Sequence, residues 1–303
     1  MGLVDAWGSN PIGWFLAHLI EAPWNIVTAL LNPGLWLNWS DGEALMRFVY
    51  YGASVELFFA FLFLVTVLTI AGLIRPGLMW AQVRGLEAFQ NTTGRFFAWA
   101  GLIMVIQQIV IIFMQRVFGA SQISLGFGKV VTFDISWWSE ELKLYNAMIV
   151  ALCIAYTFVQ GGHVRVDLFY APARFRTKKV IDMVGAALFM IPSAVLIWLY
   201  GWFFLWRNLI TPTTSASDNY ERMMAKARAL RWNVETIGFS PNGFNAYFLF
   251  KVLLILFTAL IFVSAVTCLW RAILEWREGQ ASENKYLDRD PPADAAAEFA
   301  ATK

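Results

Sequence analysis

Few residues in this chain could do chemistry, and their types exclude most reactions. Neither of the two histidines, His18 and His163, lies inside a clearly apolar segment. Because haem or chlorophyll ligation in a membrane needs a histidine embedded in a helix, this pattern argues against a redox cytochrome and gives little support to a pigment site. The sequence also contains no phosphate-binding glycine loop, no His/Glu metal motif and no nucleophile–base spacing. We therefore expect no catalytic residue, no metal and no cofactor.

Charged residues are also sparse inside the apolar segments. Glu56 lies nine positions after Arg47, where the first strongly apolar segment begins. It could pair with a partner chain, sit at the membrane boundary, or form a proton or ion site. We favour pairing or a boundary position over an ion site. Asp182 and Lys251 lie near expected helix ends, which predicts boundary anchors.

The most distinctive local sequence is GGHVRVDLFYAPARFRTKKVID, residues 161–182, which we call the elbow segment. Its two glycines can end a helix, since a left-handed backbone is common just past a helix terminus. His163, Arg165 and Asp167 then alternate with apolar residues. The pattern indicates either a headgroup-facing turn that follows the positive-inside rule, or a folded elbow in which Arg165 and Asp167 set a helix angle or dock a partner. From charge pattern alone we favour the first.

The composition predicts an all-α integral membrane protein. Of the 303 residues, 59% are hydrophobic and 15% charged, the mean hydropathy is +0.56, and there are 15 Trp. Soluble domains run about half apolar and a quarter charged, and disordered chains are more polar still. The apolar residues form blocks about as long as a bilayer is thick. Membrane lipids are therefore expected partners, and no basic tract indicates nucleic-acid binding. Cys153 and Cys268 lie inside apolar blocks, which predicts structural thiols.

We expect about five transmembrane helices. Their ranges are 47–74, 96–114, 144–159, 180–206 and 245–270. Ser139 is expected to cap the third helix ahead of the membrane, and Pro192 to kink the fourth. The Trp-rich residues 11–39 predict one or two interfacial helices, with passage of part of this stretch through the bilayer as the alternative. A short surface helix is expected at 218–232, and a solvated polar tail at 278–303.

Basic residues predict the orientation of the chain in the membrane. No Lys or Arg precedes Arg47, whereas the short connection 160–179 is dense in both. The positive-inside rule then places the N-terminus outside, in the periplasm, and the C-terminus in the cytoplasm. The connections 75–95 and 160–179 are expected on the cytoplasmic side.

Four segments in a fixed order resemble one protein family. They are FMQRVFG (113–119), ISWWSEEL (135–142), GGHVRVDLFY (161–170) and FSPNGFNAYFLFK (239–251). They are similar to the small membrane subunit, of DctQ type, of tripartite ATP-independent periplasmic (TRAP) transporters, over roughly residues 96–273. In that family an Arg closes the first span, a W-x-E-E-like segment opens the second, and a G-H-x-R-x-D sequence follows it. By this resemblance, Arg116, Trp138, Glu140 and Glu141 are expected at helix starts and interfaces, and His163, Arg165 and Asp167 in the elbow.

Residues before 96 are an addition to the family pattern. We divide the chain into a Trp-rich periplasmic or interfacial segment (1–46), an additional transmembrane helix with its cytoplasmic connection (47–95), a DctQ-like four-helix domain (96–275) with a periplasmic insertion (213–238), and a polar cytoplasmic tail (276–303).

The resemblance implies a non-catalytic small permease subunit in the bacterial inner membrane. In that family such a subunit pairs with a large multi-span permease subunit, and a periplasmic substrate-binding protein delivers an organic anion. An ion gradient drives uptake, and the substrate sites belong to the large subunit. An alternative stays open: an accessory structural subunit of another membrane complex, respiratory or photosynthetic, built on the same scaffold. An autonomous carrier is disfavoured, because no inverted repeat or charged midplane cluster is visible in the sequence.

Overall fold

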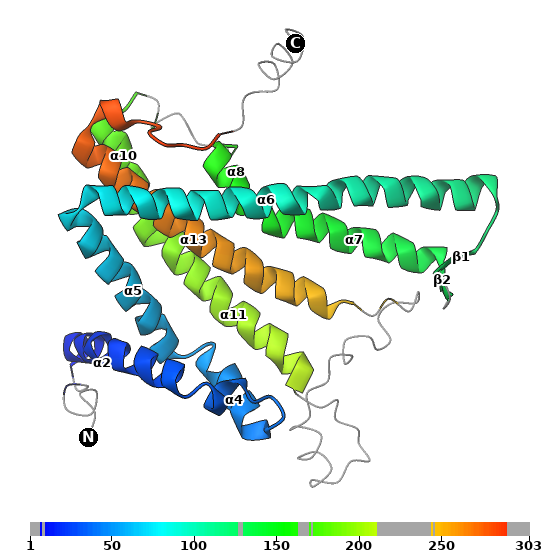
Figure 1. Cartoon of the computed structure of the whole chain (residues 1–303), viewed down its shortest axis with the longest axis horizontal. Helices are drawn as coiled ribbons and strands as arrows, with labels where there is room; N and C mark the ends of the chain where they lie inside the picture. Colours follow the sequence, from blue (N-terminus) through cyan, green and yellow to red (C-terminus); the bar gives the residue numbers. More distant parts are fainter. Residues whose placement is uncertain are drawn as a thin grey trace. The chain divides into compact units, whose positions relative to one another are not determined.

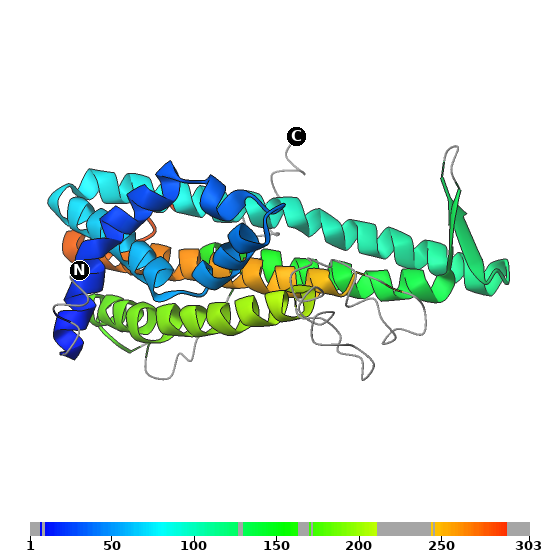
Figure 2. The same ribbon diagram turned by 90° about the horizontal axis from the view of Figure 1, so that it is seen from below.

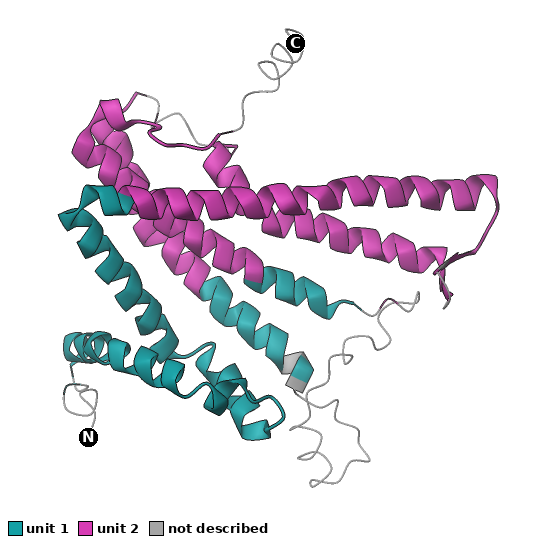
Figure 3. Cartoon of the chain, in the orientation of Figure 1, with its two compact units in different colours: residues 1–79, 196–240, 245–255 teal, residues 80–195, 241–244, 256–303 magenta. Residues whose placement is uncertain are grey.

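The computed structural model describes Trp7 and residues 10–126, 130–162, 170, 172–210, 244 and 246–289. This part of the chain is almost entirely helical, with one two-stranded sheet. It divides into two compact units (Figure 3). Residues 1–79, 196–240 and 245–255 make unit 1, and residues 80–195, 241–244 and 256–303 make unit 2. Each unit is described by itself below.

Unit 1 begins with helices joined by short turns (Figure 1). They are α2 (Pro11–Leu31), α3 (Gly34–Leu37), α4 (Gly42–Tyr51) and α5 (Val55–Ile74). Asn10, Asp41 and Ser54 cap α2, α4 and α5 with side-chain oxygens that accept a backbone N–H. The expected single helix at 47–74 is wrong over its first turns, because α4 ends at Tyr51 and a new helix, capped by Ser54, begins at Val55.

The Trp-rich residues 11–39 form one long helix, α2, and one short helix, α3, which agrees with the one or two helices expected. Helix α2 has 21 residues and is long and apolar enough to cross a membrane. It packs along α5 through aromatic rings. His18 stacks on Phe59 with ring centroids 5.1 Å apart, and the edge of Trp14 meets His18 at 4.5 Å. The imidazole of His18 is thus part of an aromatic contact between two helices.

A second aromatic cluster in unit 1 joins α4 to the later part of α11 (Ile191–Ile210). The indole N–H groups of Trp198 and Trp202 donate to the backbone carbonyls of Gly52 and Val49, each at 2.8 Å. A Cβ atom on Gly52 would overlap the Trp202 ring. The last carbonyls of a helix have no partner within it. The two tryptophans therefore satisfy the end of α4 and fix its position in the unit.

The connection expected at 75–95 is helical, which corrects the predicted loop. Helix α6 runs Pro76–Ile112 and continues as the π-helical segment η1 (Phe113–Val117). Proline suits the first position of a helix, since its φ is already helical and its missing N–H would have had no partner there. The predicted helix 96–114 is therefore the second half of a helix that begins twenty residues earlier, at Pro76.

In unit 2, α6 leads through a hairpin into a helix that runs back beside it (Figures 1 and 2). Strands β1 (Gln122–Leu125) and β2 (Val131–Asp134) pair antiparallel. Helix α7 (Ile135–Leu152) starts directly after β2 and bends by 42° at Cys153 into α8 (Ile154–Gln160). Asp134 is the N-cap of α7. The Ser139 hydroxyl donates to the Ile135 carbonyl inside the helix, so the expected cap at Ser139 is wrong.

The fourth predicted helix begins earlier than expected. Helix α10 (Phe175–Gly185) continues through the π-helical segment η2 (Ala186–Met190) into α11. Pro192 lies two residues after the last residue of this segment, Met190. Because proline lacks an N–H and its ring crowds the carbonyl four residues earlier, a widened π-turn accommodates it. A kink was expected at Pro192, and the structure has a π-helical segment in the preceding turn.

The fifth predicted helix is longer than expected. Helix α13 spans Phe248–Glu278, and the short 3₁₀ segment η4 (Gln280–Ser282) follows. Residues 279–289, which we call the strap, belong to unit 2 and pack against its helices α6, α8 and α13. The first part of the polar tail is thus bound to the protein, which corrects the predicted solvated extension. Residues 290–303 and the predicted surface helix 218–232 lie outside the described residues.

The fold class is confirmed as an all-α integral membrane protein. Five helices in the described part of the chain are long and apolar enough to cross a membrane: Pro11–Leu31, Val55–Ile74, Pro76–Val117, Phe175–Trp206 and Phe248–Glu278. Counting the bent pair α7 and α8 as one span gives six. The most apolar stretch of α5 is 11% buried, against 44% for α13. Helix α13 is therefore the most enclosed of these five helices.

Candidate partner surface and buried polar network

The Gln107 side chain of α6 contacts two of the predicted interface residues, Trp138 and Glu141. The Gln107 amide donates to the Trp138 backbone carbonyl at 3.2 Å and to the Glu141 carboxylate at 3.0 Å. The other oxygen of Glu141 accepts from the Tyr145 hydroxyl at 3.1 Å. Both carboxylate oxygens are thus hydrogen-bonded, which lowers the cost of holding a charge beside an apolar surface. This polar cluster joins α6 to α7.

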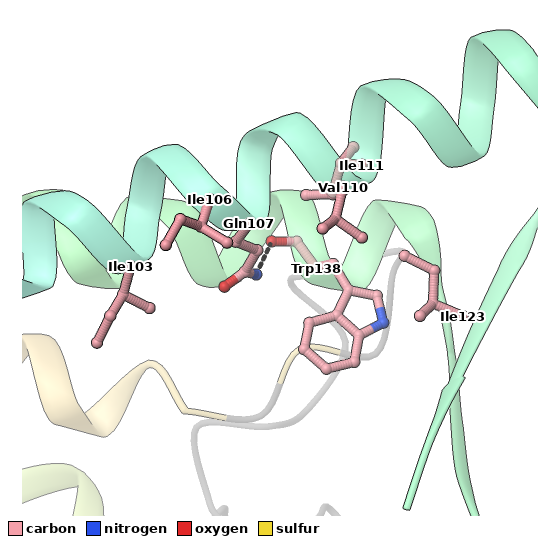
Figure 4. A pocket seen from close by; sticks show the side chains of 7 residues that line it. All are labelled: Ile103, Ile106, Gln107, Val110, Ile111, Ile123 and Trp138. Atoms are coloured by element: carbon pink, nitrogen blue, oxygen red, sulfur yellow. Dashed lines mark hydrogen bonds between the residues drawn. The ribbon is translucent and has the colours of Figure 1, made fainter.

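An apolar hollow of about 300 Å³ lies next to the cluster (Figure 4). Its lining comes from α6, α7 and β1, with branched side chains on one wall and the Trp138 indole opposite (Figure 4). The lining residues are Ile103, Ile106, Gln107, Val110, Ile111, Ile123 and Trp138. Gln107 turns its amide toward α7, so the hollow offers almost no polar surface. It can hold a hydrocarbon group but no charged substrate.

The other predicted interface residues lie apart from this cluster. Arg116 is exposed in the π-helical segment that ends α6, where a positive charge suits the negative end of the helix dipole. Glu140 pairs with Lys143 at 2.7 Å along α7. That pair is a local contact on one helix. The structure therefore brings Trp138 and Glu141 together and leaves Arg116 and Glu140 separate.

Glu56 lies in the first turn of α5, two positions after the capping residue Ser54. A carboxylate at a helix N-terminus is stabilised by the helix dipole. The sequence analysis placed Glu56 nine positions inside a helix that began at Arg47. The helix instead begins at Val55, so Glu56 lies at its N-terminus. His163, Arg165 and Asp167 lie outside the described residues, so their roles stay predictions.

A buried polar network joins α6, α10 and α13 in unit 2. Arg271 donates from Nε and Nη2 to the two oxygens of Glu87, at 2.7 and 2.6 Å. Arg271 also reaches Glu275 at 3.4 Å, and Lys179 of α10 pairs with Glu275 at 2.6 Å. The four side chains are 3% to 14% exposed. Two positive and two negative charges are thus buried together, so the network is neutral.

Uncharged polar residues extend this contact along α6 and α13. The Gln90 amide donates to Thr267 Oγ1 at 3.0 Å, and its oxygen accepts from Ser264 Oγ at 2.9 Å. The Trp80 indole donates to Glu278 at 2.7 Å. Because every one of these polar groups has a partner, the contact between the two helices is held in one register.

The sequence analysis missed this network, although a signal was present. Glu87, Gln90 and Asn91 follow the i, i+3, i+4 spacing that places residues on one helix face. Ser264, Thr267 and Arg271 follow the same kind of spacing in α13. The low hydropathy around Glu87, Gln90 and Asn91 predicted a loop. Their helical spacing would instead have predicted a polar stripe along one face of a helix. In the described part of the chain, no group of three His, Cys, Asp or Glu side chains could hold a metal ion.

Residues 123–227 match the family model described as "Tripartite ATP-independent periplasmic transporters, DctQ component". This segment is of the DctQ type. No curated protein and no solved structure matches the chain. The DctQ segment begins in β1 and includes α7, α8, α10 and α11. It therefore contains Trp138, Glu140, Glu141 and the elbow segment, whereas the N-terminal helices precede it.

The DctQ match over residues 123–227 and the apolar helices together support a multi-pass membrane protein. The family is a component of a transport system. Helices α2 to α6 precede the matched residues, so the match begins later than the resemblance predicted over 96–273.

Proposed function

We propose that this chain is the non-catalytic small permease subunit of a TRAP-type secondary transporter. It holds the large multi-span subunit in place while that subunit moves an organic anion, driven by an ion gradient. The substrate reaches the large subunit from a periplasmic binding protein. In this role the chain supplies a stationary wall and carries no substrate site of its own.

The observation that carries this proposal is the large apolar surface that the chain leaves uncovered. In α5, Leu64 and Ile70 are 50% and 52% exposed, and in α6 Ile106 is 53% exposed. Lipid tails can cover part of such a surface, and a second set of apolar helices can cover it equally well. A helical subunit with broad uncovered faces suits assembly with a larger membrane partner.

The pairing of the buried charges supports the same role. The two buried carboxylates and two buried cations of unit 2 balance one another in charge; they are Glu87, Glu275, Arg271 and Lys179. Transport of a proton or an ion through a membrane usually uses an ionisable side chain that faces a cavity. The hollow beside Trp138 is instead apolar. These features suit a structural subunit better than a translocation pathway.

Within this proposal the N-terminus faces the periplasm and the C-terminus faces the cytoplasm, following the distribution of Lys and Arg. The elbow segment braces the large subunit on the cytoplasmic side through Arg165 and Asp167. The predicted surface helix 218–232 and the Trp-rich N-terminus border the docking surface of the binding protein on the periplasmic side.

Co-purification tests the assignment. The tagged chain is expressed with the very apolar multi-span protein and the secreted binding protein encoded beside it, and extracted in mild detergent. We expect the multi-span protein to co-purify, and uptake in proteoliposomes to require both membrane chains. Uptake by the large protein alone at an unchanged rate would overturn the proposal. Capture of a pigment- or cofactor-bearing complex without those partners would favour the accessory-subunit alternative.

A further inference from the structure

The strap makes two groups of contacts with the helices of unit 2, at different points along its length. The first group lies at the ion-pair network of Glu87, Arg271, Glu275 and Lys179. Arg271 donates to the Lys285 backbone carbonyl at 3.1 Å, and the backbone N–H of Asn284 donates to the Glu275 carboxylate at 3.4 Å. The Tyr286 ring lies against Trp80 with centroids 5.7 Å apart, and the Arg84 guanidinium lies 4.9 Å from the Tyr286 centroid. These contacts fix the middle of the strap.

The second group of contacts is at the end of α8. The buried Asn91 amide donates to the Asp288 carbonyl at 2.8 Å and to its carboxylate at 3.0 Å. Gln160, the last residue of α8, donates to the same Asp288 carbonyl at 3.1 Å and to Asn91 Oδ1 at 3.3 Å. Asn91 of α6, Gln160 of α8 and Asp288 of the strap therefore form one hydrogen-bonded knot.

Arg289 completes the knot over the glycine that ends α8. Its Nε donates to the Val159 carbonyl at 3.4 Å. Gly161 is left-handed, with φ 73°, and a Cβ there would come within 2.9 Å of the Arg289 guanidinium. The last carbonyls of a helix are unpaired and carry the negative end of its dipole, so a cation is favoured at this position. Arg289 thus caps α8 from a distant part of the sequence.

The strap backbone is held in an unusual conformation. Asn284 and Tyr286 both have positive φ, of 58° and 59°. A left-handed backbone is uncommon outside glycine, and for a bulky residue such as tyrosine it persists only where surrounding contacts enforce it. Contacts hold the backbone of Asn284 and Tyr286 in this conformation; they are made to Trp80, Arg84, Arg271 and Glu275. A loosely solvated tail would relax to an ordinary conformation.

We infer that the strap is a clasp that fixes the start of the elbow segment, at Gly161 and Gly162. It holds the end of α8, where the chain continues into Gly161 and Gly162, against Asn91 of α6. The elbow begins at this point, so the strap sets where the elbow starts and in which direction it leaves the helix. The inference concerns the chain without a partner and does not depend on the proposed transport role.

Hydrogen exchange of the full-length chain in detergent tests the inference. The Gly161 and Gly162 amides donate to Phe158 and Thr157, and a peptide covering 154–162 reports them by mass spectrometry. In the double variant Asp288→Ala/Arg289→Ala we expect these amides to exchange at least about tenfold faster, because the end of α8 opens more often. Peptides from the middle of α6 should keep their protection.

The matched control is Glu283→Ala, which removes an exposed strap carboxylate that has no ion pair in the described part of the chain. Its exchange at 154–162 should equal that of the unmodified chain. Equal exchange in the double variant and the control would overturn the inference. A uniform loss of protection across the whole chain would also overturn it, since the strap would then be a general stabiliser. Neither result would bear on the transport proposal.

Discussion

Arg271 of α13 and Glu87 of α6 form a two-bonded ion pair, with both carboxylate oxygens within 2.7 Å of guanidinium nitrogens. The two residues are 184 positions apart in the sequence. Their pairing joins the two longest described helices of the chain at a buried point. A planar guanidinium matches a carboxylate in this geometry, whereas a lysine ammonium supplies only a point charge.

Removing Arg271 should strongly destabilise the chain. Arg271→Ala leaves Glu87 buried without a counter-charge and weakens the hold on Glu275, so we expect a loss of about 3–5 kcal/mol in the free energy of unfolding. Denaturant unfolding in detergent micelles, followed by tryptophan fluorescence, measures this loss. The control is Arg47→Ala, which breaks an exposed pair with Glu43 at 3.4 Å and should cost below about 1 kcal/mol. Equal losses in the two variants would show that the buried pair contributes no more than the exposed one.

Two glycines of α6 should respond in opposite ways to the same substitution. A Cβ on Gly94 would overlap the Tyr156 side chain, whereas a Cβ on Gly85 meets nothing within 4 Å. Gly94→Ala should therefore force α6 and α8 apart and cost about 1–3 kcal/mol. Gly85→Ala should stabilise by about 0.5–1 kcal/mol, because alanine is the better helix former. Thermal unfolding of both variants in one detergent makes the comparison, and melting temperatures that move in the same direction would contradict the close packing.

The contact between Gln107 and Glu141 should appear as a coupling energy. Gln107→Leu leaves one oxygen of Glu141 without a donor and should cost about 1–3 kcal/mol. The double variant Gln107→Leu/Glu141→Leu removes donor and acceptor together, so it should cost less than the sum of the single changes. A double-mutant cycle on unfolding free energies measures the difference. Additivity within about 0.5 kcal/mol would mean that the two side chains do not interact.

The elbow should matter for assembly more than for folding. Arg165→Ala and Asp167→Ala should each reduce the amount of large subunit that co-purifies with the tagged chain, because each removes a charge assigned to partner contact. Unfolding of the isolated chain should change little. Normal co-purification of both variants would remove the bracing role from Arg165 and Asp167.

Deleting residues 216–234 should weaken uptake that depends on the binding protein. This range contains the predicted surface helix 218–232, assigned to the docking surface. The membrane fraction should contain the shortened chain in normal amount, and the large subunit should still co-purify. Transport assays with and without the binding protein separate a docking defect from an assembly defect. Unchanged uptake would contradict the docking assignment.

Composition and apolar blocks predicted the membrane class, and the short motifs predicted the DctQ segment. Helix ends were harder to predict. Residues 75–95 resembled a loop because Glu87, Gln90 and Asn91 are polar, yet their partners lie in α13 and the strap. A window of local hydropathy contains no information about partners so far away. The start of α5 was missed for a different reason, since Ser54 is a good cap inside a segment that is apolar on both sides.

The polar stripe between α6 and α13 also has a consequence for the order of events during synthesis. Glu87 and Gln90 leave the ribosome 184 and 177 residues before their partners. At about 5–20 residues per second they wait on the order of ten to forty seconds for α13. During that time α6 carries an unmatched carboxylate and amide, so a chain that stops before α13 contains exposed polar groups that quality-control proteases can recognise. The same stripe that holds the finished protein together can therefore mark an unfinished one for removal.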